Sequence, residues 1–488
     1  MSSQLIDAPD APDVPAGPPA PAAPLALVAR AASAGVLAAA VVPGHRFGAG
    51  TVVAALGLAV AAPTGARLRT PSGAALAVLT AGLVGVAAFR DAGWLVGTCL
   101  VAALATWSLL LSGGTGWPAT ALGIIAVPLR SAPAAPWLLR PLARLGSQER
   151  RDAALPAVRG VLVALLLLAV FGGLFATADA AFRELLGRLA LPVPGPLLPG
   201  RLLVLLAAAA LVGAAALVAA APASRQARPP YAGRILRPVE WVLPLLMLDL
   251  LFAAFVTVQL TVLFGGRDHV LSTAGLTYAQ YARQGFGQLV AAAVLTLGVV
   301  AIAARVVPVS PATDRVRKAL LGGLCLLTLV VLASASRRLG LYEQEYGFTR
   351  LRVSVDAAIA WLAVVLLLVL AAGAGRRAQW LAKAVVLSAA AGLLGFAAGD
   401  PDARIAQRNV DRFAATGELD MGYLAGLSAD AVPALQGLPE PQRSCVLAAL
   451  RPEPESWAAS NLSRARARDA LRDLPAPDCR AILRRRGR

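Results

Sequence analysis

Apolar stretches separated by short polar segments fill the chain from residue 25 to residue 399. Most of them are long enough to cross the roughly 30 Å hydrocarbon core of a bilayer as a helix. Residues 117–129 form a shorter apolar piece with Pro118 and Pro128, which would be a tilted span, a re-entrant turn or an interfacial helix. The pattern therefore predicts 11 or 12 spans, of which 11 lie at residues 25–42, 47–62, 72–89, 94–111, 155–177, 198–222, 238–264, 286–305, 319–335, 353–373 and 380–399.

Both ends of the chain depart from this pattern. Residues 1–24 are rich in Pro and Ala and contain no Lys or Arg, which predicts a disordered tail and not a signal peptide. Residues 400–488 have shorter apolar runs, and Ser428 followed by Asp430 is typical of a helix N-cap. Helical periodicity there predicts a small all-helical domain with helices at residues 403–414, 419–427, 442–450 and 455–471.

The composition supports a membrane protein. Hydrophobic residues make up 58% of the 488 residues and charged residues 15%, whereas soluble proteins are about 45–50% apolar and about 25% charged. We expect an all-α fold, a polytopic transmembrane helical bundle at residues 25–399 followed by the helical domain at residues 400–488.

The net charge of +18 would suggest a nucleic-acid partner, but its distribution does not. Four alternating loops, at residues 130–154, 223–237, 305–318 and 375–383, together carry a net charge of +13, whereas residues 400–488 carry +2. Positively charged loops face the cytoplasm, so we expect the C-terminal domain to be extracytoplasmic. If the chain has 11 spans, the N-terminus is cytoplasmic, and we favour this topology over one with 12 spans. The expected partner is the lipid bilayer, with no nucleic acid.

Asp249 is the only acid in the middle of a predicted span. A carboxylate there is costly unless it faces the bundle interior, a partner or water. It would act as a proton or cation relay, or it would be a buried acid that fixes helix packing.

Asp179 closes the span at 155–177 and is a candidate base or metal ligand at the outer end of a membrane helix. Its i,i+4 spacing to Arg183 favours an interface residue that begins a short helix.

The outer segment at residues 263–289 is dense in polar groups. An Arg-Asp-His run can support a proton switch near neutral pH, and the same residues could form an aromatic and basic interface belt. The candidates are Arg267, Asp268, His269, Tyr278, Tyr281 and Arg283.

A second outer segment, at residues 336–352, mixes tyrosine, arginine and glutamate side chains. It would bind an anionic headgroup or a carboxylate, or it would dock the outer domain through salt bridges; we favour docking. The candidates are Arg338, Tyr342, Glu345, Tyr346 and Arg350.

The four cysteines divide by location. Cys99 and Cys325 lie inside predicted spans, whereas Cys445 and Cys479 lie in the outer domain, where a disulfide can form. The sequence contains no Walker loop, His-Glu-x-x-His helix or Cys-x-x-Cys motif. We therefore expect no metal site and no cofactor.

Four segments resemble a bacterial family of uncharacterised multi-pass membrane proteins, domain-of-unknown-function family 4173, which is related to family 4153. They are LFATADAAF (174–182), LFGGRDHVLSTAGLTYAQYARQGFGQL (263–289), RRLGLYEQEYGFTRLRV (337–353) and NVDRFAATGELDMGYLAGLSADAVPAL (409–435). The resemblance implies a polytopic envelope protein and transfers no catalytic residue.

The leading functional interpretation is a non-enzymatic integral protein of the cell membrane with a sensing, scaffolding or assembly role. Its partner would be another envelope protein or a lipid headgroup. One alternative is a proton- or ion-coupled transporter that uses Asp249. Another is a membrane enzyme for a lipid-linked substrate, with Asp179 or the Asp268–His269 pair as acid–base groups.

Overall fold

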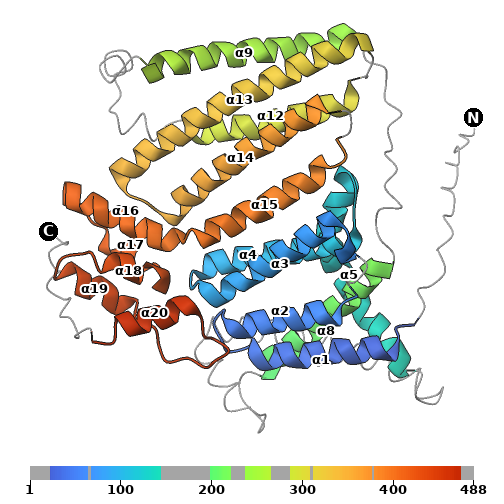
Figure 1. Ribbon diagram of the computed structural model, residues 1–488, viewed down its shortest axis with the longest axis vertical. Helices are drawn as coiled ribbons and strands as arrows, with labels where there is room; N and C mark the ends of the chain where they lie inside the picture. The colour runs from blue at the N-terminus through green and yellow to red at the C-terminus, as the bar shows by residue number, and fades with distance from the viewer. Residues whose placement is uncertain are drawn as a thin grey trace, which may run out of the picture.

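The computed structural model describes residues 22–63, 67–143, 198–220, 237–264, 286–307, 311–375 and 378–473. Every regular element among them is helical, which confirms the all-α prediction (Figure 1). Up to residue 398 the elements are α1 (Leu25–Val41), α2 (Ala49–Ala61), η1 (Arg67–Arg69), α3 (Pro71–Phe89), α4 (Gly93–Ser112), α5 (Trp117–Ala143), α8 (Leu198–Ala220), α9 (Pro238–Phe264), α12 (Phe286–Val306), α13 (Pro311–Tyr346), α14 (Arg350–Ala374) and α15 (Leu381–Ala398).

Nine of the described helices are long and apolar enough to cross a membrane, namely α3, α4, α5, α8, α9, α12, α13, α14 and α15, whereas α1 and α2 are shorter. Apart from α5, these helices run side by side together with α1 and α2, from α9 at one edge of the molecule to α1 at the other (Figure 1). Glycines allow close approach between neighbours: Gly82 on α3 lies against Leu394 on α15, and Gly213 on α8 lies against Leu138 on α5. Small residues at such contacts are typical of helix packing in lipid. The span predicted at 155–177 lies outside the described residues.

The remaining helices form a compact group that we call the C-terminal unit (residues 400–473). It has its own hydrophobic core, in which Ile405, Leu435 and Val446 are buried. The unit comprises α16 (Pro401–Thr416), α17 (Met421–Ala425), η3 (Ala429–Ala431), α18 (Val432–Leu435), α19 (Gln442–Ala449) and α20 (Leu462–Ala470).

Two of the helices predicted in this unit are wrong in extent. The run 455–471 is helical only from Leu462, because Asn461 has an extended backbone and its side chain accepts a hydrogen bond from the Arg464 N–H, which caps α20. The run 419–427 is helical only over α17. Ser428 does precede a helix, but a short 3₁₀ one, and its side chain does not cap the helix.

The C-terminal unit packs on one end of the bundle, which we call the domain end. The connections at residues 42–48, 90–92, 347–349 and 399–400 lie there, because each touches the unit or continues into it. The other end, which we call the opposite end, holds the connecting residues 67–70, 113–116 and 378–380. Arg67, for example, lies against Gly113, and Lys383 at the start of α15 lies close to Arg67.

The apolar piece predicted at 117–129 is longer than expected and does not cross the bundle. α5 continues for 27 residues, about 40 Å, yet its whole length stays at the opposite end. Ser108, near the end of α4, donates to the Gly123 carbonyl, Arg130 donates to the Leu217 carbonyl near the end of α8, and Leu138 packs beside Leu27 near the start of α1. Figure 1 shows α5 running across the ends of the other helices. Whether α5 is an interfacial helix, a re-entrant turn or a tilted span in the membrane stays a prediction.

Candidate functional site

The junction between the bundle and the C-terminal unit is built around a buried arginine. Arg464 on α20 is 1% exposed, and its Nη1 donates to Asp91 Oδ1 at 2.5 Å. Its Nε donates to Glu455 Oε2 at 2.8 Å, and its Nη2 donates to the carbonyls of Phe47 and Ala459. One guanidinium therefore joins the α1–α2 connection, the α3–α4 connection and the C-terminal unit.

Asp91 and Asp430 hold each other's backbone. Asp430, which is 3% exposed, accepts hydrogen bonds at Oδ2 from the N–H groups of Asp91 (2.9 Å) and Ala92 (2.8 Å). Asp91 Oδ2 in turn accepts from the Ala429 N–H at 2.9 Å. Ser428 Oγ also donates to Asp430 Oδ2, at 2.8 Å. Because each carboxylate satisfies main-chain donors of the other segment, the start of α4 and the 428–430 turn are fixed together.

Asp402 makes the second buried ion pair of the junction. Its fully buried carboxylate accepts from Arg350 Nη2 at 2.6 Å and from Arg350 Nε at 3.0 Å. It also accepts from Trp94 Nε1 and from the Ser428 N–H. Burial raises the pKa of the Asp402 carboxyl, but the hydrogen bonds from Arg350 and Ser428 outweigh burial and hold the pKa below its usual value. The carboxylate is therefore ionised, and it ties α14, α4 and the C-terminal unit together.

Arg90 and Asp400 form a third pair, at the ends of α3 and α15. Arg90 Nη1 donates to Asp400 Oδ2, and its Nε and Nη2 donate to the carbonyls of Ala397 and Ala398. Asp400 Oδ1 accepts from the Ala403 N–H and caps α16. Burial and the neighbouring Asp430 raise the pKa of Asp400 to about 6, although Arg90 opposes this shift. This carboxyl therefore changes charge near pH 6.

The segment at 336–352 contacts the C-terminal unit mainly through main-chain hydrogen bonds, whereas the favoured interpretation had a cluster of salt bridges. Asn409 donates through Nδ2 to the Phe348 carbonyl and accepts at Oδ1 from the Phe348 N–H. Arg412 donates to the carbonyls of Gln344 and Glu345, and the Arg350 N–H donates to Tyr423 Oη at 2.7 Å. Docking uses main-chain groups and Arg350, and the Glu345 carboxylate does not take part in these bonds.

The other candidates in this segment lie on α13. The rings of Tyr342 and Tyr346 contact each other at a tilt of 53° with centroids 4.9 Å apart, and the Arg352 guanidinium lies 4.2 Å from the Tyr342 centroid. Arg338 is further from the junction and donates to Gln259 Oε1 on α9 at 2.9 Å. The segment is therefore not a single cluster, because Arg338 belongs to the α9–α13 contact and Arg350 belongs to the junction.

Asp249 lies in the contact between α9 and α13. Its carboxyl faces Gly323, where a Cβ would come within 3.8 Å of Oδ2. Its Oδ1 is buried and has no hydrogen-bond partner among the described residues. A carboxyl in this setting is an orphan polar group within the bundle.

Several candidates lie outside the described residues, so the hypotheses that depend on them stay predictions. They are Asp179, Arg267, Asp268, His269, Tyr278, Tyr281, Arg283 and Cys479. Cys445 is disulfide-bonded, whereas Cys99 and Cys325 are free. The pairing of Cys445 with Cys479 stays a prediction for the same reason. Over the described ranges, no three His, Cys, Asp or Glu side chains are grouped so that they could hold a metal ion.

Sequence reasoning missed the central residues of the junction, which are Asp91, Asp402 and Arg464. Asp91 carries a usable signal, since an acid in the short connection between two predicted spans must leave the hydrocarbon or find a partner. The other two residues carry no such signal. They sit in polar helices where an acid or an arginine is ordinary, and their burial depends on residues more than 300 positions away along the chain, such as Trp94 and Asp91.

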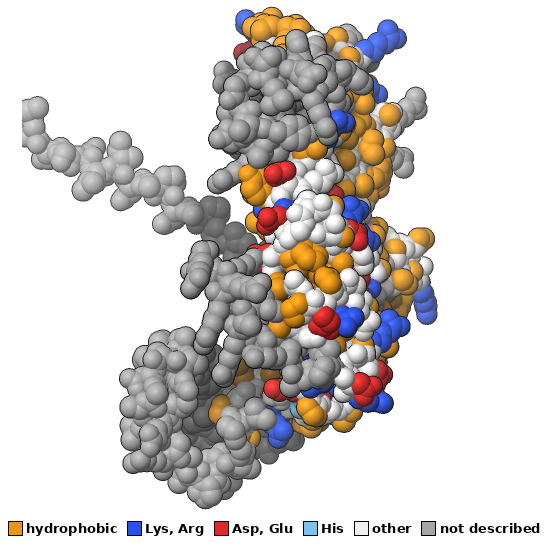
Figure 2. Space-filling model, turned by 90° about the vertical axis from the view of Figure 1, so that its left-hand side faces the viewer, with side chains coloured by type: hydrophobic (Ala, Val, Ile, Leu, Met, Phe, Trp, Pro, Cys, Tyr) orange, Lys and Arg blue, Asp and Glu red, His pale blue; other side chains and the backbone are white. Residues whose placement is uncertain are grey.

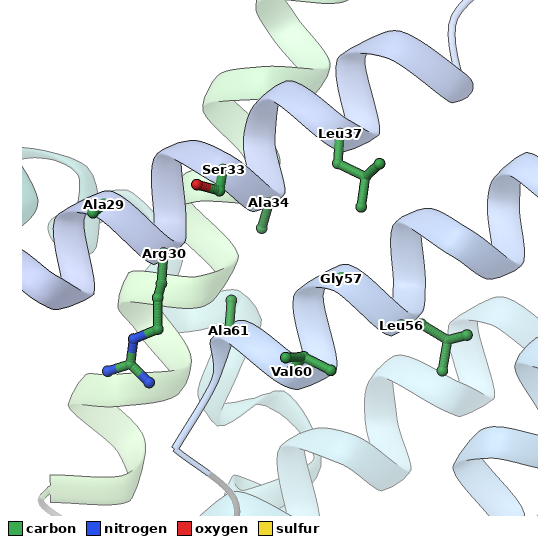
Figure 3. A pocket seen from close by; sticks show the side chains of 9 residues that line it. All are labelled: Ala29, Arg30, Ser33, Ala34, Leu37, Leu56, Gly57, Val60 and Ala61. Atoms are coloured by element: carbon green, nitrogen blue, oxygen red, sulfur yellow. The ribbon is translucent and has the colours of Figure 1, made fainter.

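A shallow groove of about 460 Å³ lies between α1 and α2, away from the junction (Figure 3). Leu37 and Leu56 line it, and Gly57 lies at the point where Leu37 approaches α2. Arg30 is the only charged residue in its lining. Its apolar walls are typical of a helix surface that faces lipid.

The family described as "Domain of unknown function (DUF4153)" matches residues 77–438 of the chain. The match begins well before residue 174, where the first of the four resembling segments begins, and it includes Asp91, Arg350, Asp402 and Asp430 of the junction. No curated protein and no solved structure is significantly similar to the chain. Because the match covers well over half of the 488 residues, this multi-helix membrane protein belongs to the DUF4153 family.

Proposed function

We propose that the protein is a scaffold of the cell membrane that presents its C-terminal unit, in one fixed position, to other components of the envelope. The observation that carries this proposal is the junction of buried ion pairs. Removing one partner of such a pair leaves an uncompensated buried charge, so undocking the unit would expose or strand Asp91, Asp402 and Arg464 together. A unit held in this way is suited to presenting a surface.

The distribution of charge supports an extracytoplasmic location for the C-terminal unit. Described residues at the opposite end carry a clear basic excess, with Glu240 and Asp314 as the acids. Positive residues concentrate on the cytoplasmic side, so the domain end would face outward. The basic residues are Arg67, Arg69, Arg130, Arg140, Arg237, Arg305, Arg315, Arg317, Lys318 and Lys383.

The face of the C-terminal unit carries acidic and basic side chains interspersed with apolar ones (Figure 2). Trp457 is 62% exposed on this unit. Large exposed aromatic side chains are enriched at protein interfaces. A second envelope protein is therefore the partner that this face would bind.

The orientation is tested by single cysteines labelled with a membrane-impermeant maleimide. We expect Arg466→Cys on α20 to be labelled in intact spheroplasts, and Ala121→Cys and Arg140→Cys, near the two ends of α5, to be labelled only in inverted vesicles. Labelling of the two α5 positions from different sides would show that α5 crosses the membrane. Labelling of Arg466→Cys only in inverted vesicles would refute the orientation.

The scaffold role is tested by photo-crosslinking in cells from a benzoylphenylalanine placed at position 457. We expect an adduct with an envelope protein, and we expect Arg464→Met to abolish it by undocking the unit. Asp249→Asn is the control: it removes the carboxyl that the transporter alternative requires, and the adduct should be retained. Crosslinks that are absent at 457 and at other exposed positions of the unit would contradict the scaffold proposal.

A transporter is the second candidate, and the orphan Oδ1 of Asp249 favours it. A carboxyl without a partner inside a bundle is typical of proton relays. In proteoliposomes with an enclosed pH dye, a transporter would dissipate an imposed proton gradient, and Asp249→Asn would abolish this flux while Asp356→Asn would not. The membrane-enzyme hypothesis, with Asp179 or Asp268 and His269, and the relation to family 4173 stay predictions.

A further inference from the structure

A groove of about 620 Å³ opens where the membrane helices meet the C-terminal unit. Its membrane part is formed by Gly82, Gly85 and Phe89 on α3 and by Leu394 on α15. Its upper part is formed by the C-terminal unit, where Asp430 and Arg466 line it. Phe89 is 57% exposed and Leu462 is 39% exposed, so the groove is open at the end of α3, where the membrane helices meet the C-terminal unit.

Glycines keep the membrane part of the groove open. A Cβ on Gly85 would have no atom within 4 Å, so the space beside this residue is empty. Gly82, one turn earlier, lets Leu394 approach α3, because a Cβ there would come within 2.8 Å of the leucine side chain. Ala81, eight residues before Phe89, also lines the groove, which therefore extends about 12 Å along α3 from its end.

The polar part of the groove is lined by a carboxylate with an unused acceptor and by an arginine that forms no ion pair among the described residues. Asp430 Oδ2 is occupied by three donors, but its buried Oδ1 has no partner among the described residues. Arg466 is exposed and, in the described part of the chain, forms no ion pair or hydrogen bond. A buried carboxylate oxygen without a donor is costly, so this position is suited to an N–H or O–H group of a ligand.

We propose that this groove binds a phospholipid with a primary amine in its headgroup, of the phosphatidylethanolamine class. One acyl chain lies in the space beside Gly85, the phosphate pairs with Arg466, and the ammonium donates to Asp430 Oδ1. The apolar lining, the cation and the acceptor each match one chemical part of such a lipid. A phosphatidylcholine headgroup has no N–H to donate, and a phosphatidylglycerol headgroup brings a net negative charge toward Asp400 and Asp430.

Native mass spectrometry of the detergent-purified full-length protein tests this proposal. The protein is incubated with equal amounts of phosphatidylethanolamine, phosphatidylcholine and phosphatidylglycerol of the same acyl chains. We expect phosphatidylethanolamine to bind with about tenfold higher affinity than the other two, the effect of roughly one charge-assisted hydrogen bond. Equal occupancy by all three lipids would overturn the proposal.

Two variants separate the groove from the rest of the surface. Gly85→Leu fills the chain site from a position where a Cβ has no atom within 4 Å, and it should reduce phosphatidylethanolamine binding by about tenfold or more. Gly392→Leu is the matched control, since Gly392 on α15 also has no atom within 4 Å of a Cβ and does not line the groove. Wild-type binding by Gly85→Leu, or an equal loss with Gly392→Leu, would overturn the proposal.

Asp430→Asn tests the headgroup contact separately from the chain site. The amide oxygen can keep accepting from Asp91 and Ala92, while the amide nitrogen replaces the free acceptor with a donor. We expect the preference for phosphatidylethanolamine over phosphatidylcholine to disappear while the melting temperature shows that the fold is retained. A folded Asp430→Asn variant with the preference intact would contradict the assigned headgroup contact.

Discussion

Single buried charges hold the C-terminal unit in place. Arg464 donates to side chains or carbonyls on three separate segments, and Asp402 accepts from Arg350, Trp94 and the Ser428 N–H. Replacing a whole buried pair by apolar residues can be neutral, but removing one partner costs about 3–5 kcal/mol because the other charge stays buried and unpaired. The junction is therefore sensitive to single substitutions.

Arg464→Met should destabilise the protein by at most about 3–5 kcal/mol, because Asp91 and Glu455 lose their buried partner and keep only the more exposed Arg46 and Arg468 as ion-pair partners. The measurement is the thermal melting of the purified protein in detergent. Arg472→Met is the matched control. Arg472 directly follows α20, but it pairs with Asp469 in solvent, and the two side chains are 73% and 72% exposed. A melting temperature that is unchanged by Arg464→Met would show that the junction does not hold the unit.

Asp400 predicts a pH dependence with a definite sign. Its folded pKa of about 6 lies above the ordinary aspartic acid value of 3.8, chiefly because of burial, so the folded state binds more protons than the unfolded state between these values. Stability from this group is fully present below pH 3.8 and is lost as the pH rises to about 6. Asp400→Asn keeps the cap of α16 and should remove this slope. Chemical denaturation of both proteins between pH 4 and 7 measures it, and parallel stability curves would contradict the assignment.

The turn between α13 and α14 is determined by the residues at the ends of the two helices. The segment at 336–352 reads as a polar outer loop, but α13 continues to Tyr346 and α14 begins at Arg350. The chain reverses at Gly347, whose φ of 82° is in the left-handed region. Thr349 then caps α14 by accepting from the Arg352 N–H. A tight hairpin of this kind places Phe348 and Arg350 directly against the C-terminal unit.

Gly347→Ala should destabilise the docked hairpin by about 1–2 kcal/mol. A side chain is strained in the left-handed region, and a Cβ would lie 2.8 Å from Asn409 Oδ1. Gly340→Ala, on the preceding helix α13, is the control, because a Cβ there has no neighbour within 4 Å and alanine favours the helix. Limited proteolysis and thermal melting compare the two. Equal stability of the two variants would show that the hairpin geometry is not required.

At the scale of the whole molecule, the described connections alternate between the two ends of the bundle. α4 ends at the opposite end and α8 begins at the domain end, since Gly200 lies beside Pro43. With α5 lying across the opposite end, the chain must change ends between Ala143 and Leu198. The span predicted at 155–177 would meet this requirement, and it brings the total to 11 when α1 and α2 are counted. This parity agrees with the favoured cytoplasmic N-terminus.

An extracytoplasmic C-terminal unit allows the disulfide predicted between Cys445 and Cys479. The bridge would close a loop of about 35 residues and contribute on the order of 3–4 kcal/mol in the chain-entropy model. After alkylation of free thiols, the boiled wild-type protein should migrate differently with and without reductant, and Cys445→Ser should remove the difference. Identical mobility of the wild-type protein under both conditions would contradict the bridge.

The sequence by itself determines the fold class of this protein and most of its spans. Apolar length and the alternation of basic loops are local properties, and lipid forces every backbone polar group in a span into a helix, so α3, α4, α8, α9, α12, α13, α14 and α15 follow from composition alone. Composition does not determine where these helices end. α13 and α14 extend into polar residues, whose helical state depends on what they contact.

Only the tertiary structure decided what α5 does and where the site lies. Hydropathy records how apolar a segment is but not its direction, so α5 could be placed only by its contacts with Ser108, Leu217 and Leu27. The junction likewise joins Asp91 to Arg464 and Asp402 to Trp94, residues far apart in the chain. A charge is buried or solvated according to its neighbours in space, and those neighbours are set by packing and not by the local sequence.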